Sequence, residues 1–435
     1  MTPAGDRSPR IEPAIRAAWS LGRRVTPRQI DLLLRIAPER VLAPVKPRLA
    51  AMGIPEQTVA AVLTRVRALS RWSVAWTGAA QRFLGDARRA RDLDDERGEA
   101  FAARMAALAY GVAAWMPAGG ANELRALRVT AAALFARSLP ILEPATERID
   151  VPWRTTTLPA LLVRPPGLAG PVPLVVLLNG MTTCKEEILC WIEPFLWQGF
   201  AVLALDWPGT GEAALRVELT PDCDDLATGV FALADDDPSL DPRRVAFVGV
   251  SIGGALATRI GATDRRVAAA IAVTPPFDAS AWLPLAGSLL RAHLGVHLGG
   301  LERIPDLAAG FALPAVGGRV RAPLLVLGAG RDLIVPPAEA IRLAAAEGDN
   351  ATLVWYAAGS HALFNLIPLW TGDAASWLAD LFGPPSTRVD DPPVSTWRGE
   401  PSGLRTPPRA SLDPARTPHL HSAPLPSSPG ACPRP

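Results

Sequence analysis

Short aliphatic runs alternate with helical segments between about residue 147 and residue 356, and this alternation limits the folds open to the chain. The runs carry few polar residues, as strands do when both faces of a sheet are covered. The predicted strands are Glu147–Trp153, Thr156–Val163, Leu174–Leu178, Ala201–Leu205, Arg244–Val248, Val267–Val273, Leu324–Leu327 and Thr352–Tyr356. The predicted helices between them are Lys185–Gln198, Asp224–Ala234, Ser251–Gly261 and Ala338–Glu347. The pattern predicts an α/β fold with a mostly parallel, doubly wound sheet.

The chain before about Glu147 shows helical patterning and no period-2 alternation. Thr26-Pro27-Arg28-Gln29 has the form of a capping box with proline at the first helical position. Helical patterning continues through Val59–Leu84, Arg97–Trp115 and Asn122–Arg137. We therefore predict an all-helical, cap-like domain over residues 1–145, followed by an α/β domain over residues 146–382.

Two further segments depart from the alternation. Residues 278–319 are too long for a simple crossover and contain the apolar stretch Leu283–His297. We predict a helical lid above the carboxyl ends of the strands, where ligands bind in open α/β sheets. The alternative is a surface excursion without function. Residues 383–435 are rich in Pro, Ser and Arg and lack periodicity, which predicts a disordered tail.

Composition excludes several classes of partner. The 435 residues carry 44 Lys+Arg against 42 Asp+Glu, a net charge of +2, so we expect neither nucleic acid nor an anionic membrane as a partner. The N-terminal residues form no apolar signal region, and no later stretch has the length of a membrane span. The four cysteines lack metal-ligand or disulfide-framework spacing, so we expect a cytoplasmic protein without metal or cofactor. They are Cys184, Cys190, Cys223 and Cys432.

One of the predicted strand-to-helix turns reads Gly249-Val250-Ser251-Ile252-Gly253. A serine on so tight a turn has a strained backbone, and the two glycines relieve the steric clash around it. The turn lifts the Ser251 hydroxyl clear of the sheet at a helix N-terminus, where backbone N–H groups favour developing negative charge. We predict that Ser251 is a nucleophile. The alternative is a glycine-rich turn with an incidental serine.

A serine nucleophile needs a histidine to accept its proton, and the chain has five histidines. His419 and His421 fall in the predicted tail. His293 and His297 lie four residues apart in the predicted lid, where they could form a metal pair, but no acidic third ligand follows at useful spacing. His361 stands in a turn just past the last predicted strand, and it is the predicted base.

An acid must then hold the tautomer of His361. Asp332 follows the preceding predicted strand and gives the chain order Ser251, Asp332, His361. That order is the one found in α/β-hydrolases and differs from those of chymotrypsin and subtilisin. Asp278, at the end of the strand before the predicted lid, is the alternative acid.

Two backbone donors are needed for an oxyanion hole. The N–H of Ile252, directly after the nucleophile, is the first candidate. The second is the N–H of Met181, in the loop after an earlier predicted strand. Gly180 would let that backbone approach closely, although it could also serve only as a turn residue.

The chain resembles the α/β-hydrolases, over about residues 60–382. Within them it is similar to the subgroup that includes 2,6-dihydroxypseudooxynicotine hydrolase, fungal pigment enzymes that shorten a polyketide chain, and fermentation-respiration switch proteins. The similarity rests on NGMTTCKEE (Asn179–Glu187), LDWPGTGE (Leu205–Glu212), DPRRVAFVGVSIGG, RDLIVP and GSHALFN. It implies an α/β-hydrolase fold in which Ser251, Asp332 and His361 are nucleophile, acid and base. Asn179 and Met181 stand where the subgroup carries small and acidic residues.

The resemblance also implies a type of substrate. A serine hydrolase of this kind would form an acyl-enzyme from an ester, or from a β-dicarbonyl or polyketide-type molecule cleaved at a C–C bond. The helical domain and the lid would close the pocket, and four aromatic residues could line it for an aromatic small molecule. They are Trp72, Trp76, Tyr110 and Trp115. Aromatic residues at helical spacing are more often plain core. An acyltransferase or cyclase with the same triad, a non-catalytic regulatory protein, and a homodimer all stay compatible with the sequence.

Overall fold

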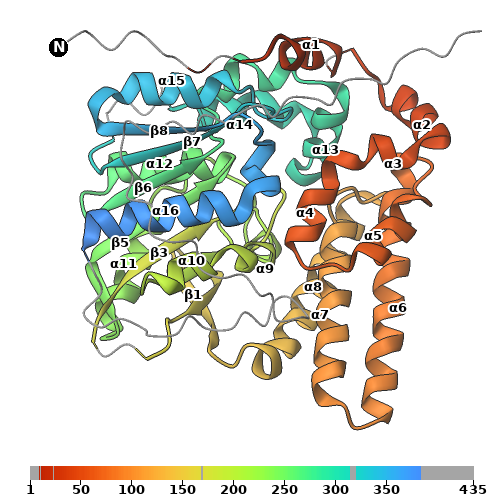
Figure 1. The fold of residues 1–435 in the computed structure, drawn as a ribbon, viewed down its shortest axis with the longest axis horizontal. Helices are drawn as coiled ribbons and strands as arrows, with labels where there is room; N and C mark the ends of the chain where they lie inside the picture. The colour runs from red at the N-terminus through yellow and green to blue at the C-terminus, as the bar shows by residue number, and fades with distance from the viewer. Residues whose placement is uncertain (1–8, 10, 23, 168–169, 314–319, 384–435) are drawn as a thin grey trace, which may run out of the picture. The chain divides into compact units, whose positions relative to one another are not determined.

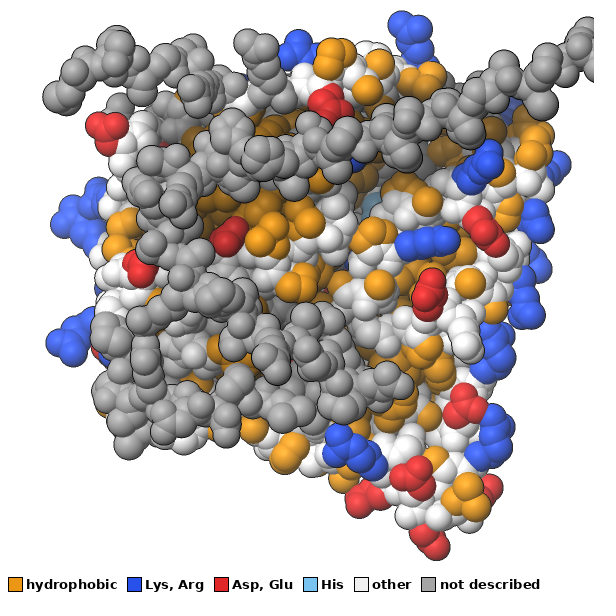
Figure 2. All heavy atoms as spheres, viewed as in Figure 1, with side chains coloured by type: hydrophobic (Ala, Val, Ile, Leu, Met, Phe, Trp, Pro, Cys, Tyr) orange, Lys and Arg blue, Asp and Glu red, His pale blue; other side chains and the backbone are white. Residues whose placement is uncertain are grey.

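The computed structural model describes residues 9, 11–22, 24–167, 170–313 and 320–383. The tail expected from residue 383 onward lies outside the described residues, apart from Gly383. Residues 314–319 of the expected lid also lie outside them. No helix in the described ranges has both the length and the apolarity needed to cross a bilayer. On the face shown in Figure 2, basic and acidic side chains of the described residues are interspersed.

The described residues form an eight-stranded sheet in the order β1-β2-β4-β3-β5-β6-β7-β8 (Figure 1). The pairs β1–β2 and β2–β4 are antiparallel, and the other neighbours are parallel. The strands are β1 (Thr146–Trp153), β2 (Thr156–Val163), β3 (Val172–Leu178), β4 (Ala201–Leu205), β5 (Leu240–Val250), β6 (Ala269–Val273), β7 (Leu324–Ala329) and β8 (Ala351–Tyr356). Each lies at the position of a predicted strand, which confirms the predicted fold class.

Six helices cover the two faces of this sheet. One face packs against α9 (Lys185–Ile188), α10 (Glu193–Trp197) and α16 (Ile367–Phe382). The other packs against α11 (Leu226–Asp236), α12 (Ile252–Thr263) and α15 (Ala338–Glu347). The prediction of one continuous helix over Lys185–Gln198 is wrong. The segment forms two helices, α9 and α10, because Pro194 at the start of α10 has no N–H to continue the hydrogen-bond ladder of a preceding helix.

The described residues before Thr146 are helical, as predicted. The helices are α1 (Pro13–Gly22), α2 (Pro27–Ile36), α3 (Pro38–Val41), α4 (Lys46–Ala51), α5 (Glu56–Leu63), α6 (Trp72–Asp92), α7 (Glu96–Ala113) and α8 (Gly120–Leu142). The capping box is present, since Thr26 Oγ1 accepts from the N–H of Gln29 while the Gln29 side chain accepts from the N–H of Thr26. The helical segment predicted over Val59–Leu84 is interrupted, because α5 ends at Leu63 and α6 begins at Trp72.

These helices share one hydrophobic core with a face of the sheet. Leu34 of α2 and Trp72 of α6 belong to the same buried cluster as Val175 of β3 and Trp370 of α16. The long helices α6, α7 and α8 run side by side in Figure 1. A domain boundary near residue 145 therefore stays a prediction, because one continuous hydrophobic core includes residues from both sides of it.

The predicted helical insertion stands between β6 and β7. It contains α13 (Ser288–Leu298) and α14 (Ile304–Gly310). Its base is tied to the sheet by Glu339 of α15, whose carboxylate accepts hydrogen bonds from the N–H groups of Phe277 and Asp278 at 3.0 and 2.8 Å. Helix α13 of the insertion packs against α8, so the insertion contacts the N-terminal helices.

Candidate active site

Ser251 joins β5 directly to α12. Its backbone has φ 57° and ψ −124°, a conformation that non-glycine residues rarely adopt and that turns a side chain away from the sheet. A hydrogen bond of 2.8 Å from the Ser251 N–H to the carbonyl oxygen of Val273, at the end of β6, holds this turn. The geometry is that of a nucleophile elbow, with the serine at the N-terminus of a helix.

The glycines around Ser251 are sterically required. A Cβ at Gly249 would lie 1.9 Å from the carbonyl oxygen of Gly253, and one at Gly253 would lie 2.4 Å from the carbonyl oxygen of Asn179. Both distances are far below van der Waals contact, so any larger residue would force the turn open. The second contact also shows that the loop after β3 lies directly against the elbow.

Asp332 and His361 are brought together from the loops after β7 and β8. His361 Nδ1 lies 2.8 Å from Asp332 Oδ2. The other carboxylate oxygen accepts from the N–H groups of Ile334 and Val335 at 2.8 and 2.9 Å. Asp332 is buried, whereas the His361 side chain keeps 20% exposure. An imidazole held through Nδ1 presents Nε2 as the free nitrogen.

His361 is also tied to the strand that holds the elbow. The N–H of Ala362 donates to Thr274 Oγ1 at 3.1 Å, and Thr274 directly follows Val273, the backbone partner of Ser251. Within the described residues there is no hydrogen bond between the Ser251 hydroxyl and His361. Such contacts often tighten only in the substrate complex.

The alternative acid, Asp278, is used elsewhere. Its carboxylate accepts from the Ser280 hydroxyl at 2.5 Å and lies 3.8 Å from the Arg342 guanidinium. It makes no hydrogen bond to His361 within the described part of the chain. The geometry therefore favours Asp332 over Asp278 as the partner of the imidazole.

The two candidate oxyanion donors flank the elbow. A Cβ placed on Gly180 would lie 3.7 Å from Ser251 Cβ, which puts the backbone of the Asn179–Met181 loop beside the serine. Neither the N–H of Met181 nor that of Ile252 donates to any described residue. Gly180 itself has room for a Cβ, so its role is not to relieve a clash. Both N–H groups are available to an incoming oxygen.

A buried ionic network fixes the loop that follows Met181. Lys185 Nζ, fully buried, donates to Glu186, Asp206 and Glu212 at 2.6, 3.1 and 2.8 Å. Burial opposes the charge of Lys185, but the three carboxylates outweigh it and raise the pKa of the ammonium. Burial raises the pKa of Asp206 to about 6, against the attraction of Lys185. The network went unpredicted, although its residues stand in the NGMTTCKEE and LDWPGTGE stretches.

A narrow cavity lies between the 182–187 loop and the helices α7, α8 and α13. Its volume is about 40 Å³. The lining includes Trp115, Arg128 and His297 together with residues of the 182–187 loop.

Of the four aromatic residues expected at the pocket, only Trp115 lines this cavity. Trp72 and Trp76 are fully buried core residues, and Tyr110 is half-buried against the same cluster. Arg48 and Trp72 stack on the Trp115 ring. Trp72 and Trp76 are thus core residues, the role that helical spacing favoured over a place in the pocket.

Among the described residues, no group of three or more metal-ligating side chains gathers around the histidine pair of the insertion. His293 and His297 do lie on one turn of α13, with ring centroids 5.0 Å apart. His297 instead contacts Arg128 and the carbonyl oxygen of Trp115. Cys184, Cys190 and Cys223 form no disulfide among the described residues.

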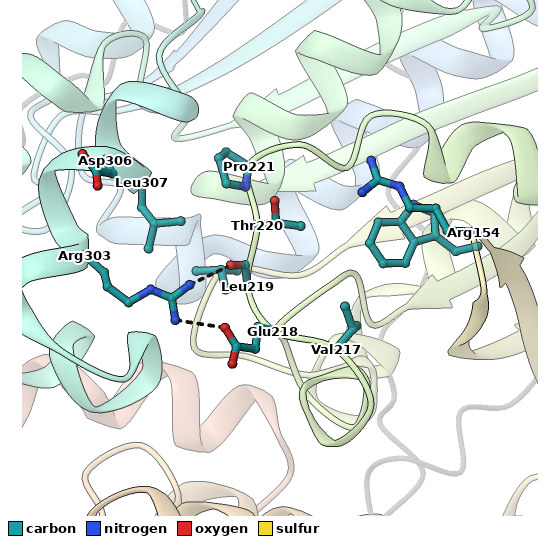
Figure 3. Close-up of a pocket in the computed structure, with 10 residues that line it drawn as sticks. Arg154, Val217, Glu218, Leu219, Thr220, Pro221, Arg303, Asp306 and Leu307 are labelled. Atoms are coloured by element: carbon teal, nitrogen blue, oxygen red, sulfur yellow. Dashed lines mark hydrogen bonds and ion pairs between the residues drawn. The ribbon is translucent and has the colours of Figure 1, made fainter.

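Figure 3 shows a larger cavity, with a volume of about 500 Å³. It is lined by the turn after β1, the Val217–Pro221 loop and α14. Arg303 bonds Glu218 and Arg154 bonds Asp222, whereas Asp306 forms no ion pair with a described residue. None of its lining residues belongs to the Ser251 site.

Comparisons with known proteins give two family matches. A family model described as the alpha/beta hydrolase family matches residues 175–428, and one described as esterase FrsA-like matches residues 57–279.

Curated relatives cover shorter parts of the chain. Hydrolyase poxO of Penicillium oxalicum is 32% identical over 173 residues, which are 37% of this chain and 40% of that protein. Hydrolase LUC6 of a Fusarium species is 28% identical over 48% of this chain and 52% of that protein. The 2,6-dihydropseudooxynicotine hydrolase of Paenarthrobacter nicotinovorans is 29% identical over 32% and 37%. The chain thus matches about half or less of the length of these relatives.

Solved structures match over a longer part of the chain. The crystal structure of 2,6-dihydroxy-pseudo-oxynicotine hydrolase has a TM-score of 0.67 at 21% identity, over 79% of this chain and 98% of that one. Wild-type AbyA5 has a TM-score of 0.62 at 19% identity, over 79% and 95%. At these identities the likeness shows the fold.

Proposed function

Because the chain belongs to the alpha/beta hydrolase family, we propose that it is a serine hydrolase in which Ser251, Asp332 and His361 act as nucleophile, acid and base. One observation carries the proposal. The carboxylate of Asp332 holds His361 Nδ1 at 2.8 Å, in a loop bonded to the strand that also positions the strained Ser251 turn. The proposal is further supported by the positions of Ser251, Asp332 and His361 after β5, β7 and β8, at the carboxyl ends of parallel strands.

The reaction proceeds in two halves. The Ser251 hydroxyl adds to a carbonyl carbon of the substrate while His361 Nε2 takes its proton. The N–H groups of Ile252 and Met181 stabilise the resulting oxyanion. The intermediate then expels its leaving group, which receives the proton from His361. Water, deprotonated by His361, releases the acyl group from Ser251 as a carboxylic acid.

The leaving group defines the substrate class. With an ester it is an alcohol. With a β-dicarbonyl or polyketide-type ketone it is a carbanion stabilised as an enolate, so that a C–C bond is cleaved. The triad serves both, because it acts on the carbonyl and leaves the leaving group to the pocket. Resemblance to hydrolases and esterases of this family supports either substrate.

Hydrolysis of p-nitrophenyl butyrate tests the proposal. We expect turnover by the full chain and its loss in Ser251→Ala and in His361→Ala, with circular dichroism unchanged. Turnover that survives Ser251→Ala at the wild-type rate would overturn the assignment. The same reaction with added alcohol or amine separates a hydrolase from an acyltransferase, since a transferase forms the new ester or amide in preference to the acid.

A further inference from the structure

Arg128 places a positive charge beside the cavity without pairing it to a carboxylate. The residue lies on α8 and lines the space next to Thr182 and Cys184. Its Nη2 donates to His297 Nδ1 at 3.1 Å, and within the described residues it forms no ion pair. A half-buried guanidinium normally has a carboxylate partner, because taking the charge from water is costly.

The partner that Arg128 does have is a neutral imidazole. His297 Nε2 lies 3.2 Å from the carbonyl oxygen of Trp115, which can only accept, so Nε2 carries the hydrogen and Nδ1 accepts from Arg128. Burial and the nearby charges of His293 and Arg128 hold the pKa of His297 well below its usual value. His297 therefore orients the guanidinium without neutralising it.

The acidic side chains that line the same cavity are already occupied. Glu186 accepts from Lys185, and Glu212 accepts from Lys185 and Arg148. Glu187 receives a two-pronged contact from Arg48, at 3.0 and 2.6 Å. Among the described residues that line this cavity, Arg128 is therefore the charged residue whose N–H donors are available to a ligand.

We propose that Arg128 binds a planar, two-oxygen anion on the substrate, namely a carboxylate or the enolate of a β-dicarbonyl group. The inference rests on the proposed function, since it gives the class of acyl substrate that reaches Ser251. A guanidinium matches two coplanar oxygens with parallel N–H donors. Thr183, which lines the cavity, donates from its hydroxyl to the carbonyl oxygen of Gly180 at 2.9 Å, and a Cβ on Gly180 would lie 3.7 Å from Ser251 Cβ. The cavity therefore adjoins the loop that lies beside the elbow.

The test compares two chromogenic esters with the same acyl length. One is the mono-p-nitrophenyl ester of adipic acid, which ends in a carboxylate, and the other is p-nitrophenyl hexanoate. The measured quantity is the ratio of their kcat/KM values, corrected for spontaneous hydrolysis. Within each variant this ratio cancels any general loss of activity. We expect Arg128→Met to lower the ratio by at least about tenfold, the value of a charge-assisted hydrogen bond.

Arg125→Met is the matched control, because Arg125 is an exposed arginine one turn earlier on α8. It should leave the ratio at the wild-type value, and Arg128→Lys should restore part of it. An Arg128→Met ratio equal to that of wild type would overturn the proposal. If Ser251→Ala hydrolysed both esters as wild type does, the proposed nucleophile would fail instead, and the two failures are distinguishable.

A second measurement separates the two sources of the anion. Adipate and 1,1,1-trifluoroacetylacetone, an open-chain β-diketone that is ionised at mildly alkaline pH and can turn both oxygens to one side, are compared as competitive inhibitors of p-nitrophenyl hexanoate hydrolysis. The anion class that loses inhibition in Arg128→Met is the one bound there. Inhibition by both compounds that does not change in Arg128→Met would contradict the inference.

Discussion

His361 Nδ1 lies 2.8 Å from Asp332 Oδ2, and the second oxygen of that carboxylate is already held by two N–H groups of its own loop. The carboxylate therefore has a fixed orientation, and so has the imidazole bonded to it. The indole N–H of Trp19, on α1, adds a 3.0 Å hydrogen bond to the carbonyl oxygen of Asp332. The acid loop is thus held from both the sheet and the N-terminal helices.

Asp332→Asn should leave the fold intact and lower kcat by about 10³–10⁴-fold, because an amide supports the wrong imidazole tautomer. Steady-state kinetics on p-nitrophenyl butyrate measure the loss. Asp278→Asn is the control, since that carboxylate contacts Ser280 and Arg342, and kcat should stay within about twofold of wild type. A larger loss from Asp278→Asn than from Asp332→Asn would contradict the assignment of the acid.

Gly253→Ala should destabilise the protein, because its Cβ would lie 2.4 Å from the Asn179 carbonyl oxygen. We expect the free energy of unfolding to fall by about 1–3 kcal/mol, measured by urea denaturation. Gly372→Ala in α16 is the control. No atom lies within 4 Å of its added Cβ, so that variant should gain about 0.5–1 kcal/mol. Equal stabilities for the two variants would show that the turn is not tightly packed.

Lys185→Met should leave three buried or half-buried carboxylates without their shared cation. We expect the free energy of unfolding to fall by about 3–5 kcal/mol, or the soluble yield to collapse. Arg89→Met, which breaks an exposed pair with Asp86, should change stability by less than about 1 kcal/mol. A Lys185→Met protein as stable as wild type would mean that the network does not hold the loop after Met181.

His293 gives the fold a dependence on pH. Burial, assisted by the charge of Arg48, lowers the pKa of His293 to about 4. A histidine in the unfolded chain titrates near about 6.5. As the pH falls from about 6.5 to about 4, the unfolded chain binds a proton that the folded chain does not, so the free energy of unfolding decreases.

His293→Gln should remove this contribution. Relative to wild type, the variant should gain at most about 3 kcal/mol of stability as the pH is lowered through that window. Urea denaturation followed by tryptophan fluorescence at several pH values measures the difference. A difference that does not vary with pH would show that His293 takes up its proton in the folded protein as easily as in the unfolded one.

Local features could be predicted from the sequence because their causes are local. The aliphatic runs bury both faces of a strand, and the Gly249–Gly253 turn needs its glycines for steric reasons, so both were visible. Ser251, Asp332 and His361 follow the parallel strands β5, β7 and β8, whose carboxyl ends lie at one edge of the sheet. Pro194 also indicated the break between α9 and α10, but the helical spacing of apolar residues on both sides of it favoured one continuous helix.

The cavity could not be predicted, because it depends on contacts between residues far apart in the chain. Arg48 meets Glu187 across 139 residues, and Arg128 meets His297 across 169. Neither pair has a spacing that a periodicity would reveal. The same limit applies to the four aromatic residues of the N-terminal helices. Helical spacing does not distinguish a core position such as Trp72 from a cavity position such as Trp115.

Labelling by a fluorophosphonate tests directly whether Ser251 is the nucleophile, because the reagent reacts with an activated serine. The proposed mechanism predicts stoichiometric labelling of the wild-type chain, with the adduct mapped to Ser251 by mass spectrometry. It also predicts no labelling of Ser251→Ala and strongly slowed labelling of His361→Ala, while heat-denatured wild type stays unlabelled. Folded wild type that is not labelled, or Ser251→Ala labelled to the same extent as wild type, would contradict it.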